Sequence, residues 1–259
     1  MNKSDLDTIA LNNYASLCRN PYPGRGIIVG LDETGQYLVQ LYWIMGRSAN
    51  SRNRIFTLGE NGLVATEAAD PSKVEDPSLI IYNAMGEEKG QYVVSNGHQT
   101  DAVIAGIVND GVLESYGRLG VTFAGVMRSW TYEPDMPNFT SRITAVSSWW
   151  LFGKEIRPFS KMSILRKSPW HDGCDRHLYE FEGHGPGFGH CITTYSGDGD
   201  PLPSFQGEPI LLPLVGSKNK IAETYWNALN VYNTVSLAVK FIPKDGASET
   251  VIINKYCKV

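Results

Sequence analysis

Polar side chains gather at the ends of two apolar runs in the first half of the chain. Segments 82–86 and 92–101 combine tyrosine, asparagine, serine, histidine and acidic residues, and a predicted helix begins directly after them. Two more polar segments flank them: residues 46–54 carry three arginines, and residues 132–138 carry two carboxylates and an asparagine. Sites are often built at strand ends and helix starts, because the scaffold there is rigid and open. We therefore interpret the four segments as one pocket that binds an anion and moves protons.

The charge balance of the chain restricts the kind of anion. Its 259 residues carry a formal net charge of −4, which argues against a general nucleic-acid binder, because such proteins need a basic surface. The arginines of segment 46–54 are therefore a local basic cluster in a mildly acidic protein. This pattern favours a small phosphorylated ligand over a long polyanion. With 42% hydrophobic residues, the chain can bury a core as one large domain or two small ones.

No stretch of the sequence has the pattern of a targeting or membrane segment. The first residues are polar and acidic, and no window approaches ~18 unbroken apolar residues. The four cysteines, Cys18, Cys174, Cys191 and Cys257, are widely spread, which is typical of reduced thiols. We expect a cytoplasmic protein that forms a homo-oligomer and has no membrane or nucleic-acid partner.

Hydrophobic periodicity predicts an α+β fold with mainly antiparallel sheets. Ser4 is expected to cap a helix over residues 4–18. Two apolar runs, 26–31 and 36–44, are joined by a glycine-containing turn and predict a β-hairpin. Both strands are apolar on both faces, so they need one layer above and one below. Further strands are expected at 53–58, 63–67, 78–84, 91–96, 142–152, 160–167, 177–183, 190–196, 234–242 and 249–257, with two helices after residue 100 and one at 220–230.

Five short motifs follow one another in the first part of the chain. They are residues 22–25; 47–48 with 53–54; 81–83; 94–97 with 100–101; and 132–133 followed by Asn138 and Arg142. In this order and with these separations, the chain resembles the archaeal-type IMP cyclohydrolases over residues 22–146, and a fainter likeness returns at 193–195. The resemblance implies an N-terminal helical extension at 1–20. It also implies a single domain over 21–259 with an insertion near 147–190, as in a longer, bacterial-style relative.

The resemblance implies both a fold and a reaction. The fold is a four-layer αββα sandwich like that of the N-terminal-nucleophile hydrolases. The reaction closes 5-formamidoimidazole-4-carboxamide ribonucleotide (FAICAR) to IMP with loss of water, the last step of purine biosynthesis. Both reacting groups sit on adjacent carbons of one imidazole ring, so the enzyme must fix the carboxamide, move protons and hold developing charge. That chemistry requires no metal and no redox cofactor.

The same resemblance implies roles for individual residues. Glu133 transfers protons, and Tyr82 donates a hydrogen bond to the formyl or carboxamide oxygen. Arg54 and Arg47 bind the phosphate, because a guanidinium grips an oxyanion with two hydrogen bonds. Structural explanations stay open as well: a solvated loop for the arginines, and a turn or a helix cap for the asparagines and the aspartate. The remaining substrate-binding candidates are Arg25, Asn83, Asn96, Asp101, Asn138 and Arg142.

A zinc site is one competing function. Histidine and cysteine side chains, which zinc prefers, cluster late in the chain, although structural zinc sites usually show tighter and repeated pairs. We therefore expect no metal. The residues of this cluster are His171, Cys174, His177, His184, His190 and Cys191.

Two different functions are also compatible with these residues. An N-terminal-nucleophile amidohydrolase needs a nucleophile freed at the amino terminus, and Cys18 could serve only after cleavage inside the predicted helix. A non-catalytic domain that binds a purine nucleotide needs the arginines and asparagines but not Glu133. The proline-rich segment 201–209 is either a lid over the ligand or an ordered surface loop.

Overall fold

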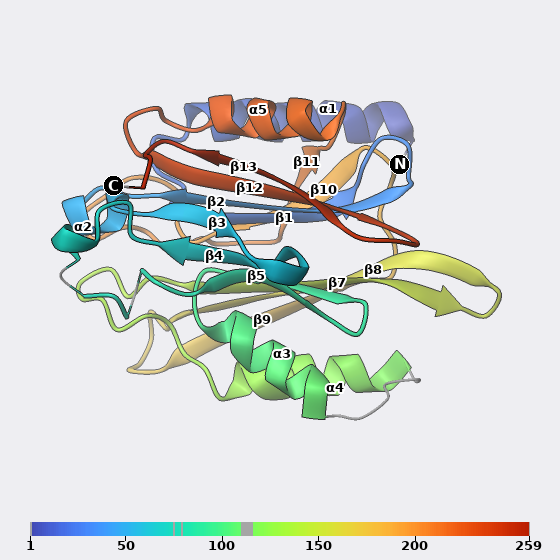
Figure 1. The fold of residues 1–259 in the computed structure, drawn as a ribbon, viewed down its shortest axis with the longest axis horizontal. Coiled ribbons are helices and arrows are strands. Elements are labelled where there is room, and N and C mark those ends of the chain that lie inside the picture. Colours follow the sequence, from blue (N-terminus) through green and yellow to red (C-terminus); the bar gives the residue numbers. More distant parts are fainter. Residues whose placement is uncertain (1, 75, 79, 110–115, 259) are drawn as a thin grey trace.

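Two antiparallel β-sheets lie face to face in the middle of the molecule (Figure 1). The computed structural model describes residues 2–74, 76–78, 80–109 and 116–258. The first sheet has six strands in the order β11-β10-β1-β2-β12-β13, and the second has seven in the order β3-β4-β5-β6-β7-β8-β9. Neighbouring strands pair antiparallel throughout both sheets, which confirms the predicted fold class.

Most strands fall where the sequence predicts them. The expected strand over 78–84 is wrong at its start, because the Ile80 and Ile81 amides both donate to the Pro77 carbonyl in a turn, and β5 begins only at Asn83. Strand β11 was not predicted. The first sheet contains β1 (Gly26–Leu31), β2 (Tyr37–Met45), β10 (Phe188–Thr193), β11 (Ile210–Pro213), β12 (Thr234–Pro243) and β13 (Glu249–Asn254). The second contains β3 (Ile55–Leu58), β4 (Val64–Glu67), β5 (Asn83–Glu88), β6 (Gln91–Ser95), β7 (Arg142–Phe152), β8 (Glu155–Lys167) and β9 (Cys174–Phe181).

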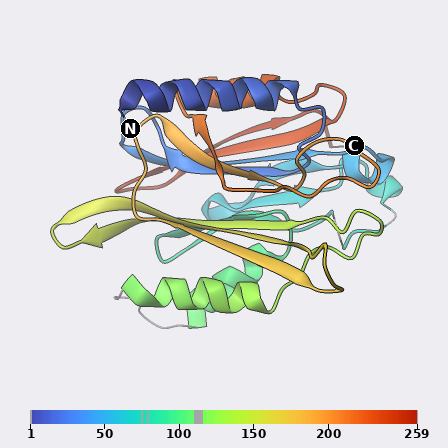
Figure 2. The same ribbon diagram turned by 180° about the vertical axis from the view of Figure 1, so that it is seen from behind.

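Helices cover the outer face of each sheet. Helices α1 (Lys3–Arg19) and α5 (Lys218–Ala228) lie over the first sheet, and α3 (Gln99–Asn109) and α4 (Tyr116–Arg128) lie over the second (Figures 1 and 2). This arrangement is the expected αββα sandwich of four layers. Shorter helical turns are α2 (Ala49–Arg52), η1 (Glu60–Gly62) and η2 (Pro71–Lys73).

The start of α1 differs from the sequence prediction. Asn2, not Ser4, caps α1: its side chain accepts a hydrogen bond from the Asp5 amide, and the Asp5 carboxylate accepts one from the Asn2 amide. This reciprocal capping extends the helix by one residue at its start. The apolar face expected for the second helix after residue 100 includes Leu113, which lies outside the described residues.

Three apolar layers explain why the central strands are buried on both faces. On β1, Ile27 and Val29 pack into the core between the two sheets, whereas Ile28 faces the helical side with Leu17 and Ile221. A third core lies between the second sheet and its helices and includes Val103, Ile107, Phe123 and Met127. The two-faced burial predicted for β1 and β2 is therefore confirmed, because each strand has an apolar layer above and below.

The expected domain boundaries and the likeness to N-terminal-nucleophile hydrolases stay predictions. In the fold, α1 supplies part of the outer layer over the first sheet, and residues 147–190 supply the end of β7 and all of β8 and β9. Among the described residues, no helix combines the length and the apolar character needed to span a bilayer.

Candidate active site

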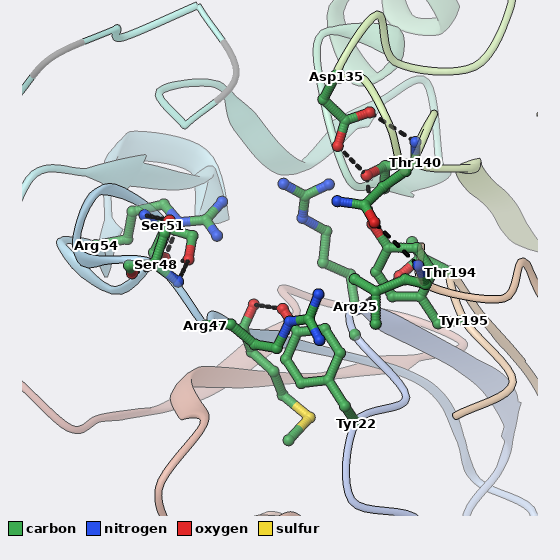
Figure 3. Close-up of a pocket in the computed structure, with 14 residues that line it drawn as sticks. Tyr22, Arg25, Arg47, Ser48, Ser51, Arg54, Asp135, Thr140, Thr194 and Tyr195 are labelled. Atoms are coloured by element: carbon green, nitrogen blue, oxygen red, sulfur yellow. Dashed lines mark hydrogen bonds between the residues drawn. The ribbon is translucent and has the colours of Figure 1, made fainter. Parts of the chain in front are cut away.

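Several strand ends meet around one cavity. Because β1 runs antiparallel to both β2 and β10, the start of β1 lies beside the ends of these two neighbours. Chain segments at these ends and the loop before β7 enclose a cavity of about 230 Å³ (Figure 3). It is lined by Tyr22, Gly24, Arg25, Met45, Arg47, Ser48, Ser51, Arg54, Asp135, Asn138, Thr140, Thr194, Tyr195 and Leu202.

Arg54 lines this cavity, and the two terminal nitrogens of its guanidinium are unpaired among the described residues. The side chain is fully buried, and its Nε donates to the Ser51 carbonyl at 2.9 Å. Its terminal nitrogens, Nη1 and Nη2, have no hydrogen-bond partner among the described residues. Burial lowers the pKa of Arg54, and the nearby charge of Arg25 lowers it further. A buried cation without an acceptor is costly, so this group is prepared for an anion.

The tight turn of α2 brings the arginines of segment 46–54 to the cavity. The Ser48 hydroxyl accepts from the Ser51 amide, and the Ser51 hydroxyl accepts from the Ser48 amide. Gly46 permits this close return, since a Cβ there would lie 2.6 Å from the Ser51 hydroxyl. Arg47 and Arg54, seven residues apart in the sequence, therefore both line one space.

Arg47 is less available than Arg54. Its guanidinium donates to the Asp198 carboxylate at 2.7 Å and to the Gly199 carbonyl at 3.1 Å. It also lies over the Tyr22 ring, 5.2 Å from the ring centre. An anion entering the cavity would therefore compete with Asp198 for Arg47, whereas Arg54 has no competing acceptor among the described residues.

Glu133 lies behind the cavity wall and pairs with Arg25. One terminal nitrogen of Arg25, Nη1, donates to both carboxylate oxygens, at 2.9 and 3.0 Å. Glu133 is only 2% exposed. Burial raises the pKa of its carboxyl above the ordinary value, although Arg25 and Arg142 act in the opposite direction. Arg25 and Arg54 point toward each other across the cavity in Figure 3, so the carboxylate and the unpaired guanidinium belong to one electrostatic cluster.

Asn96 ties Glu133 to the second sheet. Its amide nitrogen donates to the Ser141 carbonyl at 2.9 Å and, more weakly, to Glu133 at 3.4 Å. Its oxygen accepts from the Ile143 amide and from Gln99. All its hydrogen-bonding positions are therefore used within the protein, and a substrate contact by Asn96 stays a prediction.

Tyr82 lies between the two sheets, where its hydroxyl is 2.7 Å from that of Tyr42. Both side chains are buried. Tyr82 interacts electrostatically with Arg25 and Arg54. The structure therefore brings Glu133, Tyr82, Arg25 and Arg54 close to one another, but only Arg25 and Arg54 line the cavity.

The other predicted residues divide into two groups. Asn138 lines the cavity, where its side-chain oxygen accepts from the Leu202 amide, so part of the segment 201–209 contacts the cavity. Arg142 does not line it but donates to Gln99 and acts on Glu133 through its charge. Asn83 and Asp101 bond to each other at 2.8 Å at the start of α3, outside the cavity lining.

Sequence reasoning missed a chain of hydroxyl groups on one cavity wall. The Thr140 hydroxyl donates to Asp135 and contacts the Tyr195 hydroxyl. The ring of Tyr195 in turn stacks on Tyr22, with ring centres 5.9 Å apart. Asp135 and Tyr22 lie inside motifs noted in the sequence, but nothing in a single sequence pairs Thr140 with Tyr195, 55 residues away.

The cysteines and histidines considered for zinc binding or nucleophilic catalysis share no site. His184 and His190 have ring centres 5.5 Å apart, but the Cys191 thiol lies in the core on the helical side of the first sheet. In the part of the chain that the structure describes, no group of three or more His, Cys, Asp or Glu side chains could hold a metal ion. Cys18 lies within α1, near its end.

Fold and site together define a layered α+β protein with an arginine-lined cavity backed by a buried carboxylate. Residues 22–246 match the family described as IMP cyclohydrolase-like protein, and the chain belongs to that family. The matched region begins after α1 and includes every residue of the cavity and of the Arg25–Glu133 pair. No curated protein matches the chain.

Proposed function

We propose that this protein is an IMP cyclohydrolase, which closes FAICAR to IMP with loss of water in the cytoplasm, without a metal or redox cofactor. The observation that carries the proposal is the buried carboxylate of Glu133 beside an arginine-lined cavity, in a member of this family. A ribonucleotide offers a dianionic phosphate at one end and a reacting ring at the other, and the cavity offers matching chemistry at two places.

The phosphate is bound by Arg54 first and by Arg47 second. Arg54 has two terminal nitrogens without acceptors among the described residues, and charge-assisted hydrogen bonds from a guanidinium to phosphate are among the strong ones. The Ser48 and Ser51 side chains line the same region and add short polar contacts. This places the substrate's ring toward Arg25, behind which Glu133 lies.

Ring closure needs a proton acceptor and a proton donor. The carboxamide nitrogen attacks the formyl carbon and passes one proton to Glu133, while Tyr82 protonates the formyl oxygen to a hydroxyl. Glu133 then returns its proton to this hydroxyl, which leaves as water. Tyr82 recovers a proton from the former formamide nitrogen as the new C=N bond forms. Atoms and protons balance, because the two protons lost from nitrogen leave with the oxygen.

The environment of Glu133 suits both halves of this cycle. Arg25 favours the ionised carboxylate that accepts a proton, and burial favours the neutral acid that gives it back. A carboxyl whose pKa lies above the ordinary value exchanges a proton more readily near neutral pH.

The test is to supply FAICAR and follow IMP formation by absorbance. Wild type is expected to form IMP, and Glu133→Gln is expected to lose about 100-fold or more in kcat, since general acid–base groups contribute about 10²–10⁴. Glu223→Gln, an exposed change on α5, is the matched control and should keep full activity. Folded wild type that binds IMP but makes none from FAICAR would instead support a non-catalytic nucleotide-binding domain.

A further inference from the structure

Two tyrosine hydroxyls meet in the core between the two sheets. Tyr42 comes from the middle of β2, and Tyr82 immediately precedes β5. Their hydroxyl oxygens are 2.7 Å apart, which is the ordinary length of an O–H···O hydrogen bond. The Tyr42 ring packs in the core between the sheets, with its centre 5.5 Å from that of Phe56.

One hydrogen bond between two hydroxyls uses only one of their two protons. Among the described residues, neither hydroxyl has a second hydrogen-bond partner. The charged groups that act on Tyr42 are the guanidinium groups of Arg25 and Arg54, which donate hydrogen bonds and cannot accept them. The direction of the bond therefore decides which tyrosine keeps a proton for another acceptor.

Burial favours one direction over the other. Tyr42 is fully buried, whereas Tyr82 retains 4% exposure. If Tyr42 accepted the bond, its own proton would be left without an acceptor in the apolar core, which is costly. Burial, and then the neighbouring Tyr82, raise the pKa of Tyr42 well above its ordinary value, which disfavours an ionised Tyr42 that could only accept a bond.

We infer that Tyr42 is a positioning residue that donates its hydroxyl proton to Tyr82 and so leaves the Tyr82 proton free for the substrate. The role rests on the proposed function, in which Tyr82 protonates the formyl oxygen. A bond donated into the Tyr82 oxygen also stabilises the charge that develops there as the proton leaves. Tyr42 therefore acts on the reaction without touching the substrate.

The direction of the bond is tested without turnover by neutron diffraction from deuterium-exchanged crystals. The expected deuterium lies on the Tyr42 oxygen and points at the Tyr82 oxygen. Deuterium on the Tyr82 oxygen, pointing at Tyr42, would overturn the inference whatever reaction the protein catalyses. Failure of wild type to convert FAICAR would instead overturn the proposed function, and the deuterium position would still show the direction of the bond.

The kinetic role is tested by a double-mutant cycle. Tyr42→Phe removes one hydroxyl and keeps the ring, and should lower kcat about 10–100-fold with KM unchanged, part of the about 10²–10⁴ of a general acid. In a Tyr82→Phe background the same change should have no further effect, because Tyr42 acts through Tyr82. Additive losses, or a change confined to KM, would show that Tyr42 has another role.

A matched control separates this effect from the loss of a buried hydroxyl in general. Tyr225 on α5 is also buried, and its hydroxyl donates to the Pro213 carbonyl at 2.7 Å, in the helical-side core. Tyr225→Phe should leave kcat unchanged, and thermal unfolding should show that both single variants are folded. Equal losses of kcat in Tyr42→Phe and Tyr225→Phe would contradict a specific role for Tyr42.

Discussion

Replacing Arg54 by methionine should stabilise the ligand-free protein and abolish phosphate binding. Arg54 is fully buried, burial lowers its pKa, and its two terminal nitrogens have no acceptor among the described residues. Exchanging buried ionic groups for apolar ones of similar volume is often neutral or stabilising, by about 1–4 kcal/mol. The change loses one bond from the charged Arg54 to the Ser51 carbonyl, worth about 1.5–3 kcal/mol, so the expected net gain is about 1 kcal/mol at most.

The loss of binding should be much larger than the gain in stability. Each charge-assisted hydrogen bond from Arg54 to phosphate is worth about 1.5–3 kcal/mol, so losing two weakens binding by roughly 10²–10⁴-fold. A gain in stability together with a loss of binding is expected of a side chain that serves the ligand and not the fold.

Thermal unfolding in rising concentrations of IMP measures both effects in one experiment. Wild-type Tm should climb with IMP, because a ligand at about 100 times its Kd adds about 2.7 kcal/mol to stability. The Tm of Arg54→Met should be about 2–4 °C higher than that of wild type without ligand and should not change as IMP is added. The exposed Arg128→Met, at the end of α4, is the control and should follow wild type. A variant that is strongly destabilised without ligand, or that still responds to IMP like wild type, would refute the reasoning.

Three further changes test the surroundings of the site. Arg142→Gln removes a charge that lowers the pKa of Glu133, so the acid limb of the kcat/KM profile should move to higher pH; an unmoved limb contradicts the electrostatic link. Burial lowers the pKa of His184 to about 3 and of His190 to about 4, so below about pH 6.5 the unfolded chain binds more protons than the folded one. As the pH falls below this value, the free energy of unfolding should decrease by about 1.4 kcal/mol per pH unit for each histidine. Urea unfolding of His184→Gln should show a shallower fall. Asn96→Ala leaves buried backbone groups unpaired and should cost about 2–4 kcal/mol in the same assay; a neutral result contradicts its structural role.

The layers of the fold could be predicted because the central strands carry their own signal. The turn at 32–35 and the apolar runs on both sides specify the β1–β2 hairpin, and burial on both faces requires helices outside the sheets. Strand β11 could not be predicted, because its four residues end in proline within a glycine- and proline-rich stretch and pair only with β10 among the described strands. Such short edge strands depend on pairing with a neighbour more than on a pattern of their own.

The sequence pointed to site residues only where they lie in motifs that the family resemblance singled out. Glu133 and Arg54 stood out because a resemblance named their motifs, and the structure unites them across 79 residues of chain. Tyr42 gave no signal, because a tyrosine in a strand that is apolar on both faces is indistinguishable from core. Asn83 and Asp101 lie in two of the motifs that carry the resemblance, yet they bond to each other outside the cavity, since helix starts and binding sites use the same polar residues.

A crystal structure of the protein with IMP tests the central claim most directly. The account predicts the phosphate within hydrogen-bond distance of the Arg54 terminal nitrogens, with the C2 side of the purine facing Glu133 and Tyr82. IMP bound in the reverse orientation, or bound elsewhere with the cavity unchanged, would contradict it.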